Sequence, residues 1–346
     1  MLRHSTQMIH KNQFDAALVP HFRDIVKKIY SKMLPVQQKS AEILKEKLSN
    51  AAVWQTRTCP VCGCADNLPL SEGAYHYGVQ VVQCEACGFS YSLKVLTETH
   101  DKWMYETNES FYEIYLQLKK EPVYKSLEQT KAQYIIQAAS QFVHQKGHFL
   151  DVGSAVGSVI SAAQANGWHA TGVEVNPLFL KESKSKGLNV VSGFFPDALS
   201  AQYHAQFQAI SMLDVLEHMV DPITFLESAK PFIAPDGVVL IQVPNLNSLY
   251  IQLDGEQNTN YCIGHWSYFT PESLNATLEK AGFENLFLET YISEFDKVQQ
   301  FPESDIQYKV QQLTGQTLQH IDELSIDWLH EHLLGYKIFG VYKLKA

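Results

Sequence analysis

The stretch His148-Phe-Leu-Asp151-Val-Gly153-Ser154-Ala-Val-Gly157 predicts a strand, a tight turn and the start of a helix. Gly153 lets the chain turn sharply and lets a ligand approach the backbone, and Gly157 permits close packing where the helix begins. The stretch is not G-x-G-x-x-G, and the Asp151 carboxylate would repel a pyrophosphate. Both features weaken the interpretation of this stretch as a dinucleotide-binding site.

A second carboxylate stands at the end of the next predicted strand. Glu174 comes 23 residues after Asp151 and lies in the apolar stretch 170–175. A carboxylate at that place can accept hydrogen bonds from both hydroxyls of a ribose. The alternative is an ordinary surface carboxylate at a strand end, but the glycine turn upstream favours the ribose interpretation.

Beyond the glycine turn, strand and helix patterns alternate to the end of the chain. Strands are predicted at 148–152, 170–175, 207–213, 237–243, 283–290 and 336–343. Helices are predicted at 159–166, 223–233 and 271–281, the last with Thr270 as its N-cap and Gly282 at its end. A polar helical insertion, 295–330, separates the last two strands. This alternation predicts an α/β fold, a Rossmann-like sheet with helices on both faces.

Two more helical regions precede the glycine turn. In residues 1–50, apolar side chains recur at helical spacing, and we expect Pro35 to separate two helices. Packing or dimerisation is the expected use of this arm. The helical pattern of residues 100–145 carries many aromatic side chains: Trp103, Tyr105, Phe111, Tyr112, Tyr115, Tyr124 and Tyr134.

Residues 55–97, which we call the cysteine module, contain a predicted metal site. Two cysteine pairs, each followed by glycine, are Cys59-Pro-Val-Cys62-Gly63 and Cys84-Glu-Ala-Cys87-Gly88. Two C-x2-C turns can place four thiolates around one zinc ion. The alternative is a set of reduced, buried cysteines. Because no Lys or Arg lies between Cys59 and Cys87, we expect a structural zinc rather than a contact with nucleic acid.

The overall composition and charge indicate which classes of binding partner to expect. The 346 residues are 45% hydrophobic and 18% charged, with a formal net charge of −10. The acidic balance argues against a broad nucleic-acid surface. No apolar run is long enough to span a membrane, and residues 1–14 lack the apolar core of a signal peptide. We therefore expect a cytoplasmic protein without membrane contact, and its oligomeric state is left open.

Several ordered motifs resemble class I S-adenosylmethionine (SAM)-dependent methyltransferases. After the glycine turn and Glu174 come Leu213-Asp214-Val-Leu-Glu217-His218-Met-Val-Asp221-Pro222 and His265-Trp-Ser-Tyr268-Phe-Thr-Pro271. The match runs from about residue 147 to 290 and resembles the subgroup that includes the ubiquinone-pathway O-methyltransferases. With the cysteine module in front, the chain is also similar to zinc-containing sugar C-methyltransferases.

The resemblance, together with the helical patterns of the arm and the insertion, predicts a fold and a division of the chain; residues 1–50 and 295–330 lie outside the resemblance itself. We expect a seven-stranded sheet whose last strand is antiparallel. The expected segments are a helical N-terminal arm (1–54), the zinc-binding cysteine module (55–97), a helical linker or lid (98–145) and a SAM-dependent methyltransferase domain (146–346) with a helical insertion (295–332).

The same resemblance implies the cofactor contacts. Asp151, Gly153, Ser154 and Gly157 would cradle the methionine part of SAM, and Glu174 would hold its ribose. Val175 and Phe194 would border the adenine. Leu213 and Asp214 would lie near the reacting sulfonium.

Two histidines are candidates for removing a proton from the methyl acceptor. His218 and His265 each follow a predicted strand, at the sheet edge where open α/β sheets bind ligands. The alternative for each is a hydrogen-bonded structural histidine. Tyr261 and Tyr268 flank His265 and could form part of an acceptor-binding wall, although aromatic residues more often pack in a core.

The expected acceptor is a small molecule methylated on a hydroxyl oxygen. Carbon or nitrogen methylation of a sugar or secondary metabolite is the alternative; the sugar C-methyltransferases have Glu before the histidine that matches His265, where this chain has Gly264. A second alternative is a non-catalytic SAM-binding protein whose zinc module recruits a partner.

Overall fold

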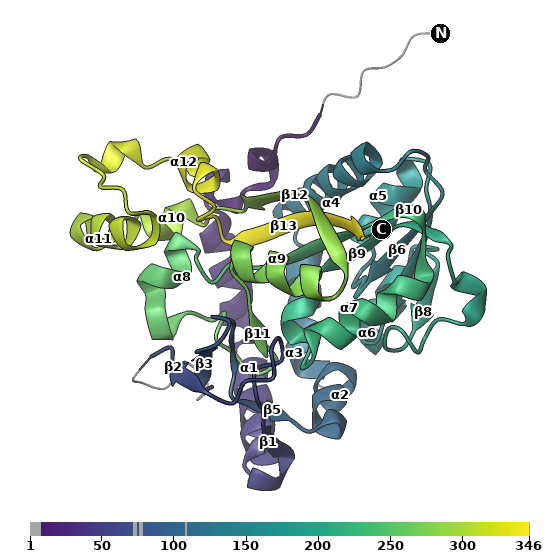
Figure 1. The fold of residues 1–346 in the computed structure, drawn as a ribbon, viewed down its shortest axis with the longest axis horizontal. Helices are drawn as coiled ribbons and strands as arrows, with labels where there is room; N and C mark the ends of the chain where they lie inside the picture. The colour runs from purple at the N-terminus through teal and green to yellow at the C-terminus, as the bar shows by residue number, and fades with distance from the viewer. Residues whose placement is uncertain (1–7, 72–74, 76–78, 108, 346) are drawn as a thin grey trace.

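The computed structural model describes residues 8–71, 75, 79–107 and 109–345, and it is built around a seven-stranded sheet (Figure 1). The strands are β6 (His148–Val152), β7 (His169–Glu174), β8 (Val190–Ser192), β9 (Phe207–Leu213), β10 (Ile233–Pro244), β12 (Phe283–Tyr291) and β13 (Lys337–Leu344). Their order is β12-β13-β10-β9-β6-β7-β8. Neighbours from β8 to β10 pair in parallel, whereas β13 is antiparallel to β10 and β12. The predicted fold with an antiparallel last strand is confirmed.

Helices cover both faces of this sheet. The helices of the parallel part are α4 (Pro122–Phe142), α5 (Ser158–Ala165), α6 (Pro177–Ser185), α7 (Pro222–Ala229) and α9 (Pro271–Lys280). Phe149 packs in the same core as the apolar faces of α4 and α5, and the adjacent Leu150 packs with those of α7 and α9. Because successive strand residues point to opposite faces, a sheet covered on both sides needs nearly continuous apolar strands.

The amino-terminal arm and the insertion lie against the last strands. They comprise the 3-10 turns η1 (Lys11–Phe14) and η2 (Ala16–Leu18), helix α1 (Phe22–Leu48), and α10 (Phe295–Val298), α11 (Glu303–Thr314) and α12 (Ile326–Glu331). The Asp15 carboxylate accepts a 2.7 Å hydrogen bond from Ser293 N, and Lys11 forms an ion pair with Glu289 at 2.9 Å. The arm therefore packs along this chain's own last strands. No helix in the described ranges is long and apolar enough to cross a bilayer.

The cysteine module builds a small sheet that reaches into the rest of the chain. Strand β1 (Trp54–Thr56) pairs with β5 (Lys94–Leu96), and a four-stranded sheet has the order β11-β4-β3-β2. Its strands are β2 (Asn67–Pro69), β3 (Val81–Cys84), β4 (Ser90–Ser92) and β11 (Ser267–Tyr268). Since β11 follows β10 in sequence, a segment far downstream completes the sheet of the module.

Two details differ from the sequence expectations. Helix α1 continues through Pro35, so the predicted break is wrong; proline removes one backbone donor but leaves the remaining helical hydrogen bonds in place. The helix predicted at 223–233 ends at Ala229, before Pro231, and Ile233 already belongs to β10.

Candidate active site and metal centre

The glycine turn joins β6 to α5 at the carboxyl edge of the parallel strands. Gly153 and Gly157 have φ values of 70° and 80°, a conformation that glycine adopts without strain. A Cβ atom at Gly157 would lie 2.2 Å from Leu188 Cδ1, and one at Gly153 would lie 2.9 Å from Val215 Cγ2. Both glycines are therefore required by conformation and by space.

Glu174 fastens this turn to the neighbouring strand. Its Oε2 accepts a 2.7 Å hydrogen bond from Ala155 N, and its Oε1 accepts one of the same length from Asn176 N. Burial raises the pKa of Glu174, and these backbone donors oppose that shift. A carboxylate has about four lone-pair positions, so each oxygen can accept a further hydrogen bond. The glycine turn and Glu174 thus meet as the sequence predicted, and their cofactor role remains a prediction.

Asp151 and Ser154 lie beneath the turn. Asp151 Oδ1 accepts a 2.6 Å hydrogen bond from Ser211 Oγ, and burial raises the pKa of Asp151 to about 7. Ser154 Oγ is buried without a hydrogen-bond partner among the described atoms, and it faces Gly172, where an added Cβ would lie 2.5 Å away. The structure places both side chains against neighbouring strands; their predicted contacts with a cofactor are not tested by this geometry.

Helices α2 (Glu98–Thr107) and α3 (Glu109–Lys120) lie near the carboxyl edge of the parallel strands. Asn176 Nδ2 donates to Tyr105 O at 3.0 Å, and the Lys102 ammonium lies 5.7 Å from the ring centroid of Phe194. Phe194 and Val175 are both half-buried. The predicted adenine neighbours therefore lie close to the predicted lid.

Asp214, at the end of β9, is held in an unusual conformation. Its φ is 56°, which non-glycine residues rarely adopt. Lys337 Nζ donates to Asp214 Oδ1 at 2.7 Å, and Gln242 Nε2 donates to Oδ2 at 2.5 Å. Burial raises the pKa of Asp214, but the charges of Lys337 and Lys131 outweigh it and hold the pKa well below its ordinary value. Leu213, the residue before it, is half-buried.

The two predicted histidines meet. The ring centroids of His218 and His265 are 4.8 Å apart, edge to face. His218 Nδ1 lies 2.8 Å from Gly264 O, and His265 Nδ1 lies 2.8 Å from Asn260 O. A carbonyl can only accept, so Nδ1 carries the proton in each neutral ring and Nε2 keeps a lone pair. Burial lowers the pKa of both imidazoles, which makes them neutral bases at pH 7.

Glu217 lies beside these rings, fully buried. Neither of its carboxyl oxygens has a hydrogen-bond partner within the part of the chain that is described, and burial raises its pKa to about 8. Glu217, His218 and His265 offer donor atoms within 4.8 Å of one another. This arrangement can take a proton from a ligand, and it could also hold a divalent cation.

Tyr261 and Tyr268 lie in a different environment from the one we expected. Both are buried, and their ring centroids are 5.5 Å apart. Tyr75 of the cysteine module lies 4.1 Å from Tyr261, and Val81 belongs to the same apolar cluster. The two tyrosines pack the cysteine module against the α/β part of the chain, and their contact with a methyl acceptor stays a prediction. Tyr105 of α2 lies nearer the histidines, with its ring 5.8 Å from His218.

Sequence reasoning missed Lys337 and Lys131. Lys337 begins β13, and Lys131 lies in α4, where Glu128 pairs with it at 3.2 Å. Both lysines influence the pKa of Asp214. Isolated lysines in a strand and a helix carry no motif, so no signal in the sequence separates them from surface lysines.

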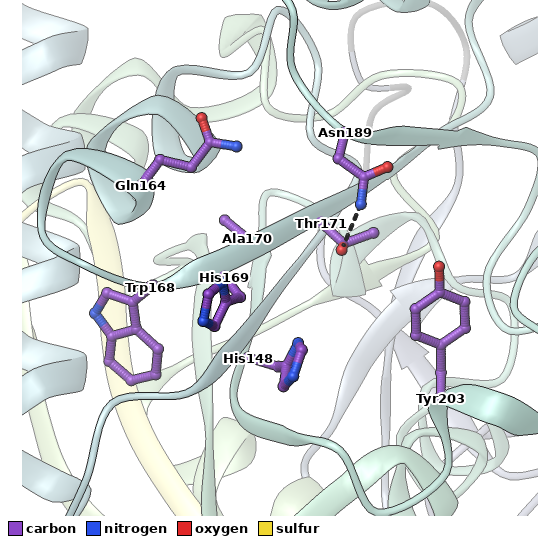
Figure 2. Close-up of a pocket in the computed structure, with 8 residues that line it drawn as sticks. All are labelled: His148, Gln164, Trp168, His169, Ala170, Thr171, Asn189 and Tyr203. Carbon is purple, nitrogen blue, oxygen red and sulfur yellow. Dashed lines mark hydrogen bonds between the residues drawn. The ribbon is translucent and has the colours of Figure 1, made fainter.

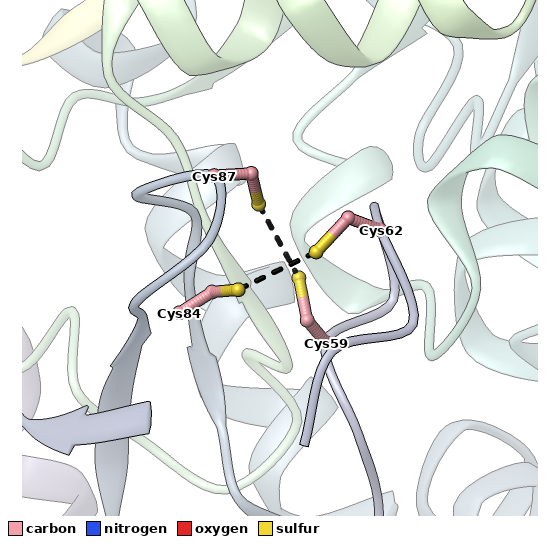
Figure 3. Close-up of side chains that lie close together, drawn as sticks. All are labelled: Cys59, Cys62, Cys84 and Cys87. Atoms are coloured by element: carbon pink, nitrogen blue, oxygen red, sulfur yellow. Dashed lines mark hydrogen bonds between the residues drawn. The ribbon is translucent and has the colours of Figure 1, made fainter. Parts of the chain in front are cut away.

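Four cysteine side chains converge in the cysteine module (Figure 3). The Sγ atoms of Cys59 and Cys87 are 3.6 Å apart, and those of Cys62 and Cys84 are 3.4 Å apart. A tetrahedral zinc site with bonds of about 2.3 Å separates its sulfurs by about 3.8 Å. The four thiols therefore fit the donor set of a zinc ion.

A surface hollow lies at the amino-terminal ends of the parallel strands, away from the glycine turn; Figure 2 shows its lining residues. It has a volume of about 420 Å³ and is lined by residues at the amino-terminal ends of β6 and β7, including His148 and His169. Its lining contains none of the predicted site residues.

The strand order, the glycine turn and Glu174 together define a methyltransferase-type α/β domain. Residues 124–288 match the family model described as a methyltransferase domain. The ubiquinone biosynthesis O-methyltransferase of Histophilus somni is 29% identical over 128 residues, which cover 34% of this chain and 53% of that enzyme. The Xylella fastidiosa enzyme of the same name is 29% identical over 103 residues, covering 28% and 41%.

The likeness is thus partial: the chain spans about half the length of the curated relatives it matches. Among solved structures, a SAM-dependent methyltransferase from Archaeoglobus fulgidus is 16% identical with a TM-score of 0.48, covering 67% of this chain and 99% of that one. Residues 124–288 are thus similar to methyltransferase domains, and the amino-terminal arm and the cysteine module precede them in the chain.

Proposed function

We propose that this chain binds SAM at the carboxyl edge of its sheet and transfers the methyl group to a hydroxyl oxygen of a small molecule. The observation that carries the proposal is the glycine turn fastened to the Glu174 carboxylate. Open α/β sheets bind their ligands at this edge. Carbon or nitrogen methylation is the alternative, and so is a protein that binds SAM without catalysis.

The described residues fit this cofactor. Gly153 and Gly157 would leave the backbone open to the methionine part, and Glu174 would accept hydrogen bonds from the ribose hydroxyls. Lys131, whose charge lowers the pKa of Asp151 and Asp214, would attract the carboxylate of the cofactor. When bound, SAM supplies an electrophilic methyl group, and the electron pair of the broken bond stays with sulfur. The remaining task of the chain is to align the acceptor and remove its proton.

His265 and His218 would remove that proton. Each ring donates through Nδ1 to a carbonyl, so each Nε2 can accept. Their lowered pKa values keep them unprotonated at neutral pH. The two rings lie 4.8 Å apart between centroids, and a backbone carbonyl orients each of them, so either ring could serve as the base.

The four-cysteine site would hold a structural zinc. The site lies in the cysteine module rather than at the sheet edge, and four sulfur ligands would complete a tetrahedral shell around zinc and leave no open position for a substrate.

The cofactor proposal is tested with Glu174→Ala. Losing two charge-assisted hydrogen bonds should weaken SAM binding by about 1–3 kcal/mol, measured by titration calorimetry. Glu272→Ala, an exposed residue in the first turn of α9, is the control and should bind as the wild type does. Tight NAD binding without SAM binding would refute the methyltransferase interpretation.

The acceptor class is tested with radiolabelled SAM. We expect label in hydroxyl-bearing acceptors from a panel of phenols, enols, amines and keto sugars. Label in amines or at carbon instead would favour the alternative methylation, and SAM binding with no transfer to any acceptor would favour the non-catalytic protein.

A further inference from the structure

Lys337 reaches the reaction edge because β13 is antiparallel. Its first residue lies where the parallel strands end, and Lys337 is paired with Pro244 of β10 on one side and Tyr291 of β12 on the other. The antiparallel direction of β13 thus places Lys337 beside the end of β9.

The ammonium of Lys337 is held in place by Asp214, but it still has N–H groups that can donate hydrogen bonds. Within the described residues it donates one hydrogen bond, to Asp214 Oδ1, which leaves two N–H groups. Asp214 is itself held by Gln242, whose Oε1 accepts from the Tyr291 hydroxyl. The Lys337 side chain is 15% exposed, whereas Asp214 keeps 39% of its side chain accessible. The pair therefore borders open space at the carboxyl edge.

The charged groups around this space are few. Lys337 lies close enough to affect the pKa of Glu217, His218, His265 and Cys262, and its ammonium is 5.3 Å from the ring centroid of Tyr336. Asp214 forms an ion pair with Lys337; the charge of Lys131 also acts on Asp214, and that of Glu294 also acts on Lys337. Glu217 is a further buried carboxyl, and it lies beside His218 and His265.

The charge balance favours an acceptor that becomes anionic. Within the described residues, Lys337 and Asp214 form an ion pair at this edge, and a bound sulfonium would add a positive charge beside it. A preorganised cation aimed at a developing negative charge stabilises it far more in such a site than in water.

We propose that Lys337 binds the acceptor oxygen and stabilises its anion while Nε2 of His265 or His218 takes the proton. This inference rests on the proposed function. The O–H bond breaks with its proton passing to Nε2, the oxygen lone pair forms the bond to the methyl carbon, and the C–S electron pair leaves with sulfur. Lys337 keeps its own protons throughout.

The test uses a probe that needs no known acceptor. 4-Nitrophenol ionises near neutral pH, and its phenolate absorbs visible light. We expect the wild-type protein loaded with S-adenosylhomocysteine to bind the phenolate. Because Lys337→Met alone would leave Asp214 unpaired, the variant is the double Lys337→Met/Asp214→Asn, with Asp214→Asn alone as its partner. The double variant should bind the phenolate at least about tenfold more weakly than Asp214→Asn, and the bound probe should shift toward the neutral phenol.

Two further variants separate charge from position. Lys337→Arg keeps the positive charge and should retain phenolate binding. Lys345→Met removes an exposed lysine near Lys337 in sequence and should leave phenolate binding unchanged. With an acceptor from the panel, the double variant should lower kcat more than it raises KM, and turnover should rise with pH as the acceptor ionises unaided.

The outcomes separate the two proposals. Failure of the wild-type protein to bind SAM or S-adenosylhomocysteine overturns the proposed function. Binding of S-adenosylhomocysteine with no phenolate binding, or with equal phenolate binding in the double variant and Asp214→Asn, overturns the role of Lys337 alone.

Discussion

His265→Asn is expected to slow methyl transfer by about 10²–10⁴-fold while leaving SAM affinity nearly unchanged. Asparagine can still donate an amide N–H to Asn260 O, as His265 Nδ1 does, but it offers no basic nitrogen in place of Nε2. Turnover and SAM affinity should be measured together. His169→Asn, at the opposite edge of the sheet, is the control and should keep full activity.

The second histidine sharpens this test. If His218 and His265 serve one proton transfer, the double variant should be little slower than the slower single variant. Because burial lowers both pKa values below the ordinary 6.5, wild-type turnover should stay level at neutral pH and fall only as acid protonates the rings. Single variants that slow turnover only a few-fold would show that proton removal is not the task of these rings.

Cys59→Ser is expected to abolish metal binding and to unfold the cysteine module. Metal analysis of the wild-type protein should give about one zinc per chain, with four sulfur ligands at about 2.3 Å by X-ray absorption. Structural zinc contributes about 10–16 kcal/mol in small zinc-folded peptides, so the module should not survive its loss. Cys64→Ser is the matched control, because Cys64 lies in the same loop but outside the four-thiol cluster.

We expect unfolding of the cysteine module to disturb the position of the histidines more than the binding of the cofactor. Ser92 Oγ donates to His265 O at 3.1 Å, and Ser92 N donates to Trp266 O at 3.0 Å. Arg57 also donates to Trp266 O and to Val220 O. Turnover in Cys59→Ser should therefore fall further than SAM affinity. Full turnover in a metal-free protein would mean that these contacts do not position His265.

The sequence predicted best where local chemistry decides structure. The glycine turn is predictable because a sharp turn and the close approach of a ligand favour glycine, and Glu174 because a carboxylate at this strand end can accept hydrogen bonds from ribose hydroxyls. Strand β8 was not located: with three residues it is too short to show a pattern. Pro35 was assigned a helix break by a local rule, although helix α1 continues through it.

The rest of the site depends on long-range packing. His218 and His265 are brought to a centroid distance of 4.8 Å only by the folded sheet, and the expectation rested on their positions after strands. Tyr261 and Tyr268 sit beside His265 in sequence yet pack against Tyr75. Lys337 enters the site through sheet topology, which no local pattern encodes.

The pairing of β11 with β4 bears on the order in which this chain can fold. Ser267 pairs with Tyr91, and Arg57 reaches Trp266, 209 positions away in the sequence. Contacts of such high sequence separation form slowly, because a long loop must close before they stabilise anything. During synthesis all four cysteines leave the ribosome long before β11 exists. A zinc ion bound early would keep the cysteine module folded before β11 is synthesised. The loop that carries His265 would then pack onto the folded module last.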